Sequence, residues 1–195
     1  RPSNPYAASK AAADLLIQSY MRTYRMPALI VRGSNNYGPF QYPEKLIPLA
    51  VSNIIECKKV PIHGSGEHKR SWLHVDDFCN AIDIVSHKAA DYSIFNVSGE
   101  EKSNLEILEI ISKNLGENFG DLKEHTNDRP GADLRYAPDS SKLKLELGWV
   151  PNHCVEESLK DIVNWYQNNQ NWWRKIKSKK NYLDHYERQV KAEYY

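Results

Sequence analysis

Residues 1–24, RPSNPYAASKAAADLLIQSYMRTY, carry the strongest structural signal in the chain. Asn4 and Pro5 are typical of a helix start, because an asparagine side chain caps free N–H groups and proline fits the first turn. Tyr6 and Lys10 lie four residues apart and therefore on one face of the predicted helix. The ammonium of Lys10 favours the ionised phenol of Tyr6, whose ordinary pKa near ~10 is too high for a base at neutral pH. The pair is a candidate for proton transfer, although the same spacing is common on helices without catalytic groups.

The composition limits the class of protein. With 195 residues, 41% of them hydrophobic, the chain can bury a core as one domain, or as one domain and part of another. Lys and Arg number 26 against 25 Asp and Glu, so the net charge does not favour nucleic acid, and an anionic partner must be held by local cations. No run approaches the ~20 apolar residues of a membrane span, so no membrane partner is expected. The three cysteines, Cys57, Cys79 and Cys154, form no CxxC pair, which indicates reduced thiols and a cytoplasmic location.

The segment after the first helix predicts an α/β fold. Residues 26–32, MPALIVR, form a continuous apolar run, which is typical of a parallel strand covered on both faces. The loop GSNNYGPFQYPEK, residues 33–45, follows the end of that strand, where open α/β sheets bind ligands. By composition alone, a simple turn-rich connector is the favoured interpretation of this loop. A helix is expected next, over residues 44–57.

Residues 58–75 are predicted to form a β-hairpin around Gly64, Ser65 and Gly66. A dinucleotide-binding loop is excluded here, because such a loop needs a third glycine and a following helix. The histidines His63, His68 and His74 flank the expected hairpin at spacings that match no metal-ligand pattern, so no metal is expected.

The rest of the chain alternates helices and strands. A helix over residues 76–88 is expected to be capped by Asp76, and a strand covers residues 93–97. Ser103 and Glu106 form a capping box, so Asn104 lies in the first turn of the next helix. Later helices are predicted over residues 140–147 and around residues 155–166.

Two basic segments have competing interpretations. The run DRPGADLRY contains Arg129 and Arg135 around a Pro-Gly turn, where two guanidinium groups either grip a diphosphate or lie on a surface turn in solvent. The run RKIKSKK, residues 174–180, follows Trp172 and Trp173 and is interpreted as a solvated helix face, so no nucleic-acid partner is expected.

A series of motifs resembles the extended short-chain dehydrogenase/reductases. In chain order they are PYAASK, RGSNNYGPFQYPEKLIP, VPIHGSGEHKRSWLHVDD, FNVSGEEKSNLE, DRPGADLRY and LGWVP. Within that superfamily the motifs are most similar to those of the dTDP-glucose 4,6-dehydratases, and UDP-glucose 4,6-dehydratases share much of the pattern. The resemblance extends from Arg1 to about Trp173.

The resemblance implies roles for the residues near the cofactor, which would be NAD. Tyr6 matches the base that takes the proton of the sugar 4-hydroxyl as hydride passes to NAD. Lys10 matches the lysine that holds the nicotinamide ribose and tunes the tyrosine. Ser34 and Asn35 match the loop that meets nicotinamide and substrate, with Ser34 toward the cofactor and Asn35 toward the sugar.

The resemblance also implies a nucleotide-sugar substrate. Lys45 and Leu46 match positions beside the nucleotide, and His63 replaces an aromatic residue that borders the base. The diphosphate and nucleotide would be gripped by Arg70, Asn104 and Arg129. The sequence departs from the pattern at Ser71, where relatives have aspartate, and at Ala132, where they have histidine.

The resemblance implies the C-terminal part of such an enzyme. Residues 1–38 would end an NAD-binding Rossmann domain, residues 39–173 would form mainly a mixed α/β substrate lobe with possible returns to the Rossmann domain, and residues 174–195 would form a basic helical extension. A GxxGxxG loop and a Thr-Asp-Glu segment with the dehydrating carboxylates are expected before the tyrosine helix, and neither occurs in this sequence. The expected function is therefore a nucleotide-sugar 4,6-dehydratase. These 195 residues alone are expected to be inactive, and the full-length form is expected to dimerise through the first helix. The alternatives are a 4-epimerase or decarboxylase of the same superfamily, and a sugar-nucleotide-binding module without catalysis.

Overall fold

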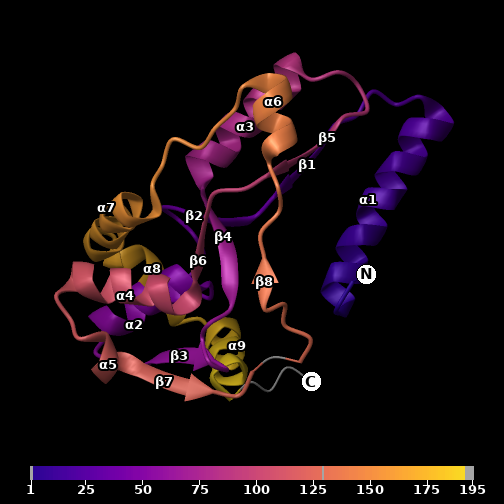
Figure 1. Cartoon of the computed structure of the whole chain (residues 1–195). Coiled ribbons are helices and arrows are strands. Elements are labelled where there is room, and N and C mark those ends of the chain that lie inside the picture. Colours follow the sequence, from indigo (N-terminus) through magenta and orange to yellow (C-terminus); the bar gives the residue numbers. More distant parts are fainter. Residues whose placement is uncertain (1, 129, 192–195) are drawn as a thin grey trace.

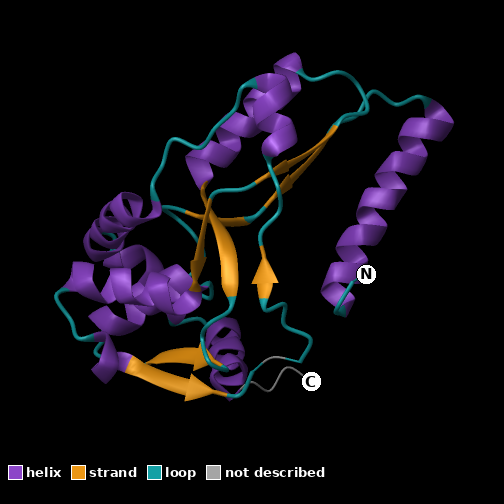
Figure 2. Ribbon diagram, viewed as in Figure 1, coloured by secondary structure: helices purple, strands orange, loops and turns teal. Residues whose placement is uncertain are grey.

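The computed structural model describes residues 2–128 and 130–191 and has an α/β fold (Figure 1, Figure 2). The helices are α1 (Pro5–Tyr24), α2 (Leu46–Ile55), α3 (Val75–Lys88), α4 (Asn104–Leu115), α5 (Phe119–Leu122), α6 (Ser141–Leu147), α7 (Val155–Asn168), α8 (Gln170–Lys177) and α9 (Lys180–Lys191). The strands are β1 (Ile30–Gly33), β2 (Asn35–Tyr37), β3 (Val60–His63), β4 (Lys69–His74), β5 (Ile94–Val97), β6 (Glu100–Ser103), β7 (Lys123–Thr126) and β8 (Arg135–Tyr136). In this described part of the chain, no helix is both long enough and apolar enough to cross a membrane.

The strands form three separate sheets. β1 and β5 pair in parallel, and β3 pairs in parallel with β7. In the third sheet β4 is central: it pairs in parallel with β2 and β8 and antiparallel with β6. The chain passes directly from the first sheet to the third at two places, after β1 into β2 and after β5 into β6.

Gly99 makes the second of these passages possible. A Cβ atom at this position would lie 1.9 Å from the carbonyl oxygen of Trp72 in β4, so a side chain cannot be accommodated without moving the backbone. The hydroxyl of Ser71 donates to the Gly99 carbonyl at 3.1 Å and accepts from the Gly99 N–H at 2.9 Å. The chain therefore crosses β4 in direct backbone contact.

Two apolar clusters form the core. The larger joins α2, α4 and α7 and includes the side chains of Ile47, Val51, Ile107, Ile111, Leu159 and Val163. The smaller lies between α3, α6 and β5 and includes Leu73, Val85, Phe95, Leu143 and Trp149. Burying one such aliphatic or aromatic side chain stabilises a fold by about 1.5–3 kcal/mol, so these clusters supply most of the driving force for folding.

Helix α1 lies to one side of the two clusters (Figure 1). Met21 is buried, whereas Leu15, Leu16 and Tyr20 of the same helix are exposed. The second half of the helix is joined to the body through polar contacts: Asp14 pairs with Arg32 at 2.5 Å, and the Tyr92 hydroxyl donates to the carbonyl of the following Arg25 at 3.1 Å. The position of α1 therefore depends on few contacts.

Several local expectations are confirmed. The Asn4 side chain accepts from the Ala7 N–H at 2.8 Å and caps α1. Ser103 and Glu106 form the expected capping box of α4, and Gly148 ends α6 with a left-handed backbone. The predicted strand over residues 93–97 is β5, which spans Ile94–Val97.

The predicted hairpin over residues 58–75 is wrong. A turn is present at Gly64–Gly66, but β3 pairs with β7 and β4 pairs with β2, β6 and β8. After the turn, the carbonyls of Gly66 and His68 accept from the N–H groups of Leu105 and Asn104. The start of α4 thus bonds to backbone groups that a hairpin would have paired, and β3 and β4 lie in different sheets.

Three further expectations need correction. The loop over residues 33–45 contains a strand, β2, because β4 offers it a parallel partner. β1 is not covered on both faces, since Arg32 is exposed and pairs with Asp14 of α1. The cap of α3 is His74 rather than Asp76, because the helix begins one residue earlier and the His74 ring accepts from the Asp76 N–H.

The basic run at residues 174–180 is not a wholly solvated face. Trp173 is fully buried, and its indole N–H donates to the Tyr166 carbonyl at 2.8 Å. Lys177 is also buried, at 8% exposed. The expected extension at residues 174–195 begins inside α8, which starts at Gln170, and in its described part Lys177 and Tyr182 contact the rest of the chain.

We expect Gly99→Ala to lower the free energy of unfolding by about 3 kcal/mol, because the new methyl group collides with the β4 backbone. Gly116→Ala is the control: it also replaces a glycine, at φ 75°, but nothing lies within 4 Å of the added Cβ, so a loss of about 1 kcal/mol is expected. Urea unfolding measures both values. Equal losses in the two variants would contradict the close crossing at Gly99.

Candidate active site

The start of α1 is tied to the loop that follows Arg129. The Ser3 hydroxyl donates to the Asp133 carboxylate at 2.7 Å, and the Asn4 amide donates to the Gly131 carbonyl at 3.0 Å. A Cβ atom at Gly131, whose φ is +69°, would lie 3.1 Å from the Ser3 carbonyl oxygen. Two segments about 130 residues apart in sequence are therefore in close contact beside Tyr6.

Tyr6 and Lys10 occupy the first turns of α1, on the same face as their spacing predicts. Tyr6 is 74% exposed, and Lys10 is also exposed. The neighbouring Ser9 hydroxyl donates to the Tyr6 carbonyl at 2.8 Å, so the hydroxyl next to the pair is engaged with the helix backbone. The phenol and the ammonium are thus accessible to a ligand bound beside the helix.

The loop after β1 holds polar atoms that lack partners. Ser34 is 7% exposed, and its hydroxyl finds no hydrogen-bond partner among the described residues. The same is true of the side-chain carbonyl oxygens of Asn36 and Gln41. An unpaired buried polar group costs about 1–3 kcal/mol, so three of them in one short loop favour a ligand that supplies the missing partners. Asn35 lies in this loop in register with Trp72 of β4.

The predicted substrate residues His63, Arg70 and Asn104 gather around one turn. Asn104 begins α4, and its N–H donates to the His68 carbonyl at 3.1 Å, two residues before Arg70. His63 ends β3 and opens the turn whose Gly66 carbonyl accepts from the next residue of α4, Leu105. Backbone bonds thus bring these three residues together from β3, β4 and α4.

Asp128 connects this group to the loop beside α1. Its carboxylate lies 3.1 Å from the His68 ring nitrogen and 3.0 Å from the position of a Cβ atom at Gly64. The next residue, Arg129, lies outside the described residues. Asp128, on one side of it, contacts His68 at the turn. Gly131, two residues after it, contacts Asn4 at the start of α1.

Arg135 is engaged in an ion pair rather than free to grip a diphosphate. Its guanidinium donates to both oxygens of the Glu101 carboxylate, at 2.9 and 2.7 Å. Bonds from Arg135 hold the pKa of Glu101 below its ordinary value. Of the two interpretations of the arginine pair, the structure supports a surface ion pair for Arg135.

Lys45 and Leu46 lie at the start of α2, and no described contact joins them to the other predicted site residues. Lys45 is exposed and pairs with Glu44 at 2.9 Å, and Leu46 is partly buried against the larger core cluster. The structure therefore does not bring Lys45 and Leu46 together with the other predicted site residues among the residues that it describes.

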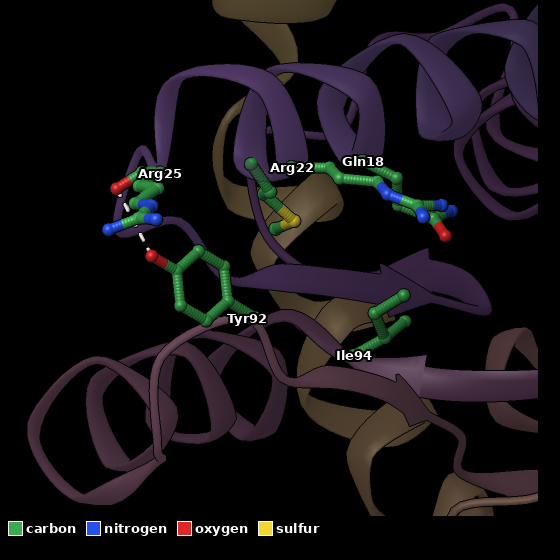
Figure 3. Close-up of a pocket in the computed structure, with 6 residues that line it drawn as sticks. Gln18, Arg22, Arg25, Tyr92 and Ile94 are labelled. Atoms are coloured by element: carbon green, nitrogen blue, oxygen red, sulfur yellow. Dashed lines mark hydrogen bonds between the residues drawn. The ribbon is translucent and has the colours of Figure 1, made fainter.

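A cavity that the sequence did not indicate lies at the far end of α1 (Figure 3). Its volume is about 510 Å³, and it is lined by Gln18, Met21, Arg22, Arg25, Tyr92 and Ile94. These residues come from the end of α1 and the residue after it, and from the start of β5 and the turn before it, and none of them is a predicted site residue. Sequence patterns could not reveal it, because the cavity exists only where the end of α1 approaches β5.

His74, Asp76 and His153 form the group of possible metal ligands in the described residues. The rings of His74 and His153 are stacked, with centroids 4.0 Å apart and planes 17° from parallel. Zinc lies about 2.0–2.1 Å from a histidine nitrogen along its in-plane lone pair, so two stacked rings do not converge on one ion. His153 is instead held by the buried Asp77, whose carboxylate accepts from the His153 N–H at 3.0 Å and contacts the ring nitrogen at 2.9 Å.

A family profile described as GDP-mannose 4,6 dehydratase matches residues 1–162. The chain belongs to this family. The dTDP-glucose 4,6-dehydratase of Escherichia coli is 41% identical over 186 residues, which cover 90% of this chain and 51% of that protein. The predicted resemblance to 4,6-dehydratases is thereby confirmed, and this member of the GDP-mannose 4,6 dehydratase family spans about half the length of the curated relatives it matches.

Solved structures share the fold of this GDP-mannose 4,6 dehydratase family member. The dTDP-glucose 4,6-dehydratase of Bacillus anthracis, in complex with NAD, has a TM-score of 0.86 at 45% identity, over 90% of this chain and 56% of that one. A UDP-glucuronic acid 4-epimerase of Bacillus cereus, with UDP-glucuronic acid and NAD, has a TM-score of 0.82 at 23% identity, over 86% of this chain and 54% of that one. The second comparison shows the fold alone.

We expect Asn4→Ala to loosen both segments that meet at the start of α1. The substitution removes the helix cap, which costs about 1 kcal/mol, and the bond to the Gly131 carbonyl. Hydrogen exchange should become faster in the first turn of α1 and in residues 130–134. Asn118→Ala, which removes the cap of α5, should leave both segments unchanged. Protection of residues 130–134 that persists in Asn4→Ala would contradict the coupling.

We expect His74 to make the fold less stable in mild acid. Burial, reinforced by the neighbouring His153, lowers the pKa of His74 below its ordinary value of ~6.5. Protons therefore bind the unfolded chain more readily, so this stability is complete above pH ~6.5 and declines as the pH falls below it. Urea unfolding at pH 7.5 and 5.5 measures the decline. His74→Asn keeps a capping side chain without a titrating group and should reduce the difference between the two pH values; an unchanged difference would contradict the role of His74.

Proposed function

We propose that this chain carries the proton-transfer helix and the substrate lobe of an NAD-dependent nucleotide-sugar 4,6-dehydratase. The reaction would oxidise C4 of an NDP-glucose, eliminate water across C5 and C6, and reduce C6, giving a 4-keto-6-deoxy sugar. The observation that carries the proposal is the tie between the start of α1 and residues 131–133, which joins the Tyr6 helix to the predicted diphosphate loop. Substrate held by the loop would therefore lie beside the phenol.

Tyr6 and Lys10 would act on the sugar 4-hydroxyl. Tyr6 would accept the hydroxyl proton, and Lys10 would hold the nicotinamide ribose and favour the ionised phenol. Both side chains are exposed on the first turns of α1, which supports these roles because each group must touch a bound molecule. The carboxylates that remove water have no assigned residues in this chain.

NAD would supply hydride transfer and return in its starting form at the end of the cycle. The residues present fit the cofactor. The Ser34 hydroxyl is buried without a described partner at the end of a parallel strand, which is where dinucleotides bind α/β sheets. Ser34, Tyr6 and Lys10 would hold it.

The substrate would be a nucleotide sugar, with dTDP-glucose favoured over UDP-glucose. The 41% identity to a dTDP-glucose 4,6-dehydratase supports this choice. Asn35 would meet the sugar, Lys45 and Leu46 would lie beside the nucleotide, and His63 would border the base. The diphosphate and nucleotide would be bound by Arg70, Asn104 and Arg129, of which the two arginines supply the local cations that a nearly neutral chain requires.

We also propose the domain division 1–38, 39–173 and 174–195, with a return of the chain to the first domain at β5, which pairs with β1. The full-length protein would be a cytoplasmic homodimer that contacts its copy through α1. The exposed Leu15 and Leu16 support this interface. The 195-residue chain alone would bind nucleotide without turnover, since the glycine-rich NAD loop and the dehydrating carboxylates are not in its sequence.

We expect Tyr6→Phe to lower kcat by about 10²–10⁴-fold in the native polypeptide that contains this chain, with dTDP affinity unchanged, because only the proton acceptor is lost. The assay supplies NAD and dTDP-glucose or UDP-glucose and follows the product by mass spectrometry. Tyr24→Phe, on the same helix and also exposed, is the matched control and should retain full activity.

The product distinguishes the candidate functions. A 4,6-dehydratase gives a product lighter by one water, whereas a 4-epimerase gives a product of unchanged mass. Full turnover by Tyr6→Phe would contradict the assignment of the base, and binding without any turnover in the native polypeptide would favour a non-catalytic binding module.

A further inference from the structure

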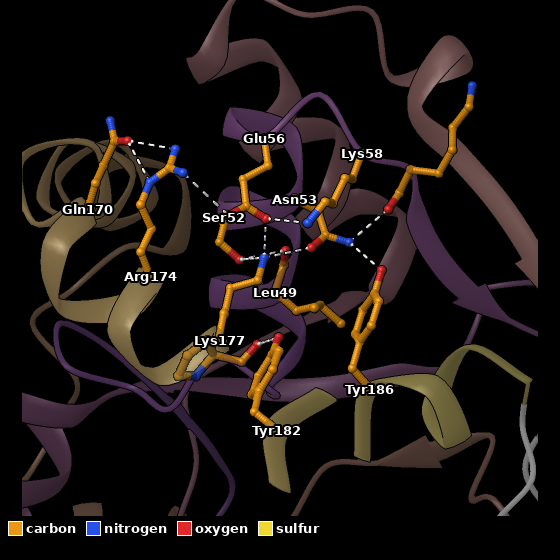
Figure 4. A network of polar contacts seen from close by, with 12 residues as sticks. Leu49, Ser52, Asn53, Glu56, Lys58, Gln170, Arg174, Lys177, Tyr182 and Tyr186 are labelled. Atoms are coloured by element: carbon orange, nitrogen blue, oxygen red, sulfur yellow. Dashed lines mark hydrogen bonds and ion pairs between the residues drawn. The ribbon is translucent and has the colours of Figure 1, made fainter. Parts of the chain in front are cut away.

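The C-terminal helices α8 and α9 lie beyond residues 1–162, which the family profile matches, and the proposed function gives them no role. Figure 4 shows that they meet α2 through a network of polar contacts. Lys177 of α8 is central to this network and donates three hydrogen bonds, to Ser52 Oγ at 3.0 Å, Asn53 Oδ1 at 3.0 Å and Glu56 Oε2 at 2.9 Å. These acceptors lie in the last turn of α2 and at the residue after it.

The contact between Lys177 and α2 is a buried charge pair. Burial lowers the pKa of Lys177, and its bond to Glu56 opposes that effect. Burial raises the pKa of Glu56, but bonds from Lys177 and Lys58 outweigh it and leave that pKa below its ordinary value. A buried ammonium is tolerated only when its donors are satisfied, so Lys177 requires this one position of α8 on α2.

The segment just before α2 is held by α9, which also contacts the last turn of α2 through the Tyr186 hydroxyl, the acceptor of a bond from the Asn53 amide at 3.0 Å. Tyr182 is buried, and its hydroxyl donates to the Pro43 carbonyl at 3.3 Å. Gln189 donates to the Glu44 carbonyl at 3.3 Å, and the His185 ring lies 3.6 Å from the Glu44 carboxylate. The segment just before Lys45 is therefore attached to α9 by its backbone as well as by a side chain.

The two helices thus contact the last turn of α2 and the segment just before it, and Lys45 and Leu46 lie at the start of that helix. We propose that α8 and α9 position Lys45 and Leu46 for the nucleotide, with Tyr182 as a positioning residue that acts through the Pro43 carbonyl. This inference rests on the proposed function, which puts Lys45 and Leu46 beside the nucleotide. It gives the basic C-terminal segment a part in substrate affinity without direct contact.

The test is Tyr182→Phe, which keeps the ring and removes only the hydroxyl. The Kd of the full chain for dTDP is measured by isothermal titration calorimetry, and it should rise by about 3–10-fold, the effect of losing one hydrogen bond. Tyr92→Phe is the matched control, because its hydroxyl also donates to a backbone carbonyl, that of Arg25, at 3.1 Å. It should leave the Kd unchanged.

A double-mutant cycle separates positioning from general destabilisation. If Tyr182 acts through Lys45, Tyr182→Phe should add little to the Kd of a Lys45→Ala variant. Hydrogen exchange at the amides of residues 45–47 should also be faster in Tyr182→Phe than in Tyr92→Phe.

The outcomes for the two proposals differ. If the wild-type chain binds dTDP, two results overturn the positioning role of Tyr182. One is an unchanged Kd in Tyr182→Phe, and the other is fully additive effects in the double-mutant cycle. A wild-type chain that does not bind dTDP overturns the proposed function instead. In that case hydrogen exchange still tests the attachment of this segment to α9. Equal exchange rates at residues 45–47 in Tyr182→Phe and in wild type overturn that attachment as well.

Discussion

The crossing of Gly99 over β4 is the contact on which the arrangement of the sheets depends. The carbonyl of Trp72 occupies the space of a side chain at residue 99, and the Ser71 hydroxyl bonds both backbone groups of Gly99. Because of this close approach, the chain leaves β5 beside the sheet of β4 and enters that sheet as β6. The ends of β1 and β5 therefore lie where the chain passes into the third sheet. The Ser71 hydroxyl both donates and accepts, so it satisfies the two backbone groups of Gly99.

The candidate site is assembled by polar contacts rather than by the apolar core. Helix α1 is mostly exposed, and Ser3 and Asn4 join its first turn to the loop at residues 131–133. Asp128 joins the same segment to His68 at the turn before β4. The position of Tyr6 relative to residues 131–133 therefore depends on these few bonds. Packing alone would leave α1 free to adopt other positions, because Met21 is its buried anchor and lies far along the helix from Tyr6.

Helix α2 illustrates how the C-terminal helices hold another element in place. Lys177 bonds to the last turn of α2 and the residue after it, Tyr182 bonds to the Pro43 carbonyl before the helix, and the interior of α2 packs in the larger apolar cluster. These contacts lie on both sides of Lys45 in the sequence. A charged side chain that appears in a basic run can thus be a buried structural group, and its energetic cost is offset by the three acceptors that α2 provides.

The sequence by itself determined the features that depend on neighbouring residues: the Asn4 cap, the Ser103–Glu106 capping box, the face shared by Tyr6 and Lys10, and the series of motifs that identifies the family. These signals are local because a cap or a helix face involves residues within one or two turns. The strand pairing, the missing hairpin, the cap at His74 and the burial of Lys177 were decided only by the tertiary structure. Each of them depends on a partner distant in sequence. Strand β4 pairs with β2, β6 and β8, the start of α4 bonds to the turn after β3, and α2 supplies the acceptors for Lys177. The pattern of one segment cannot specify which distant backbone groups will be available to it.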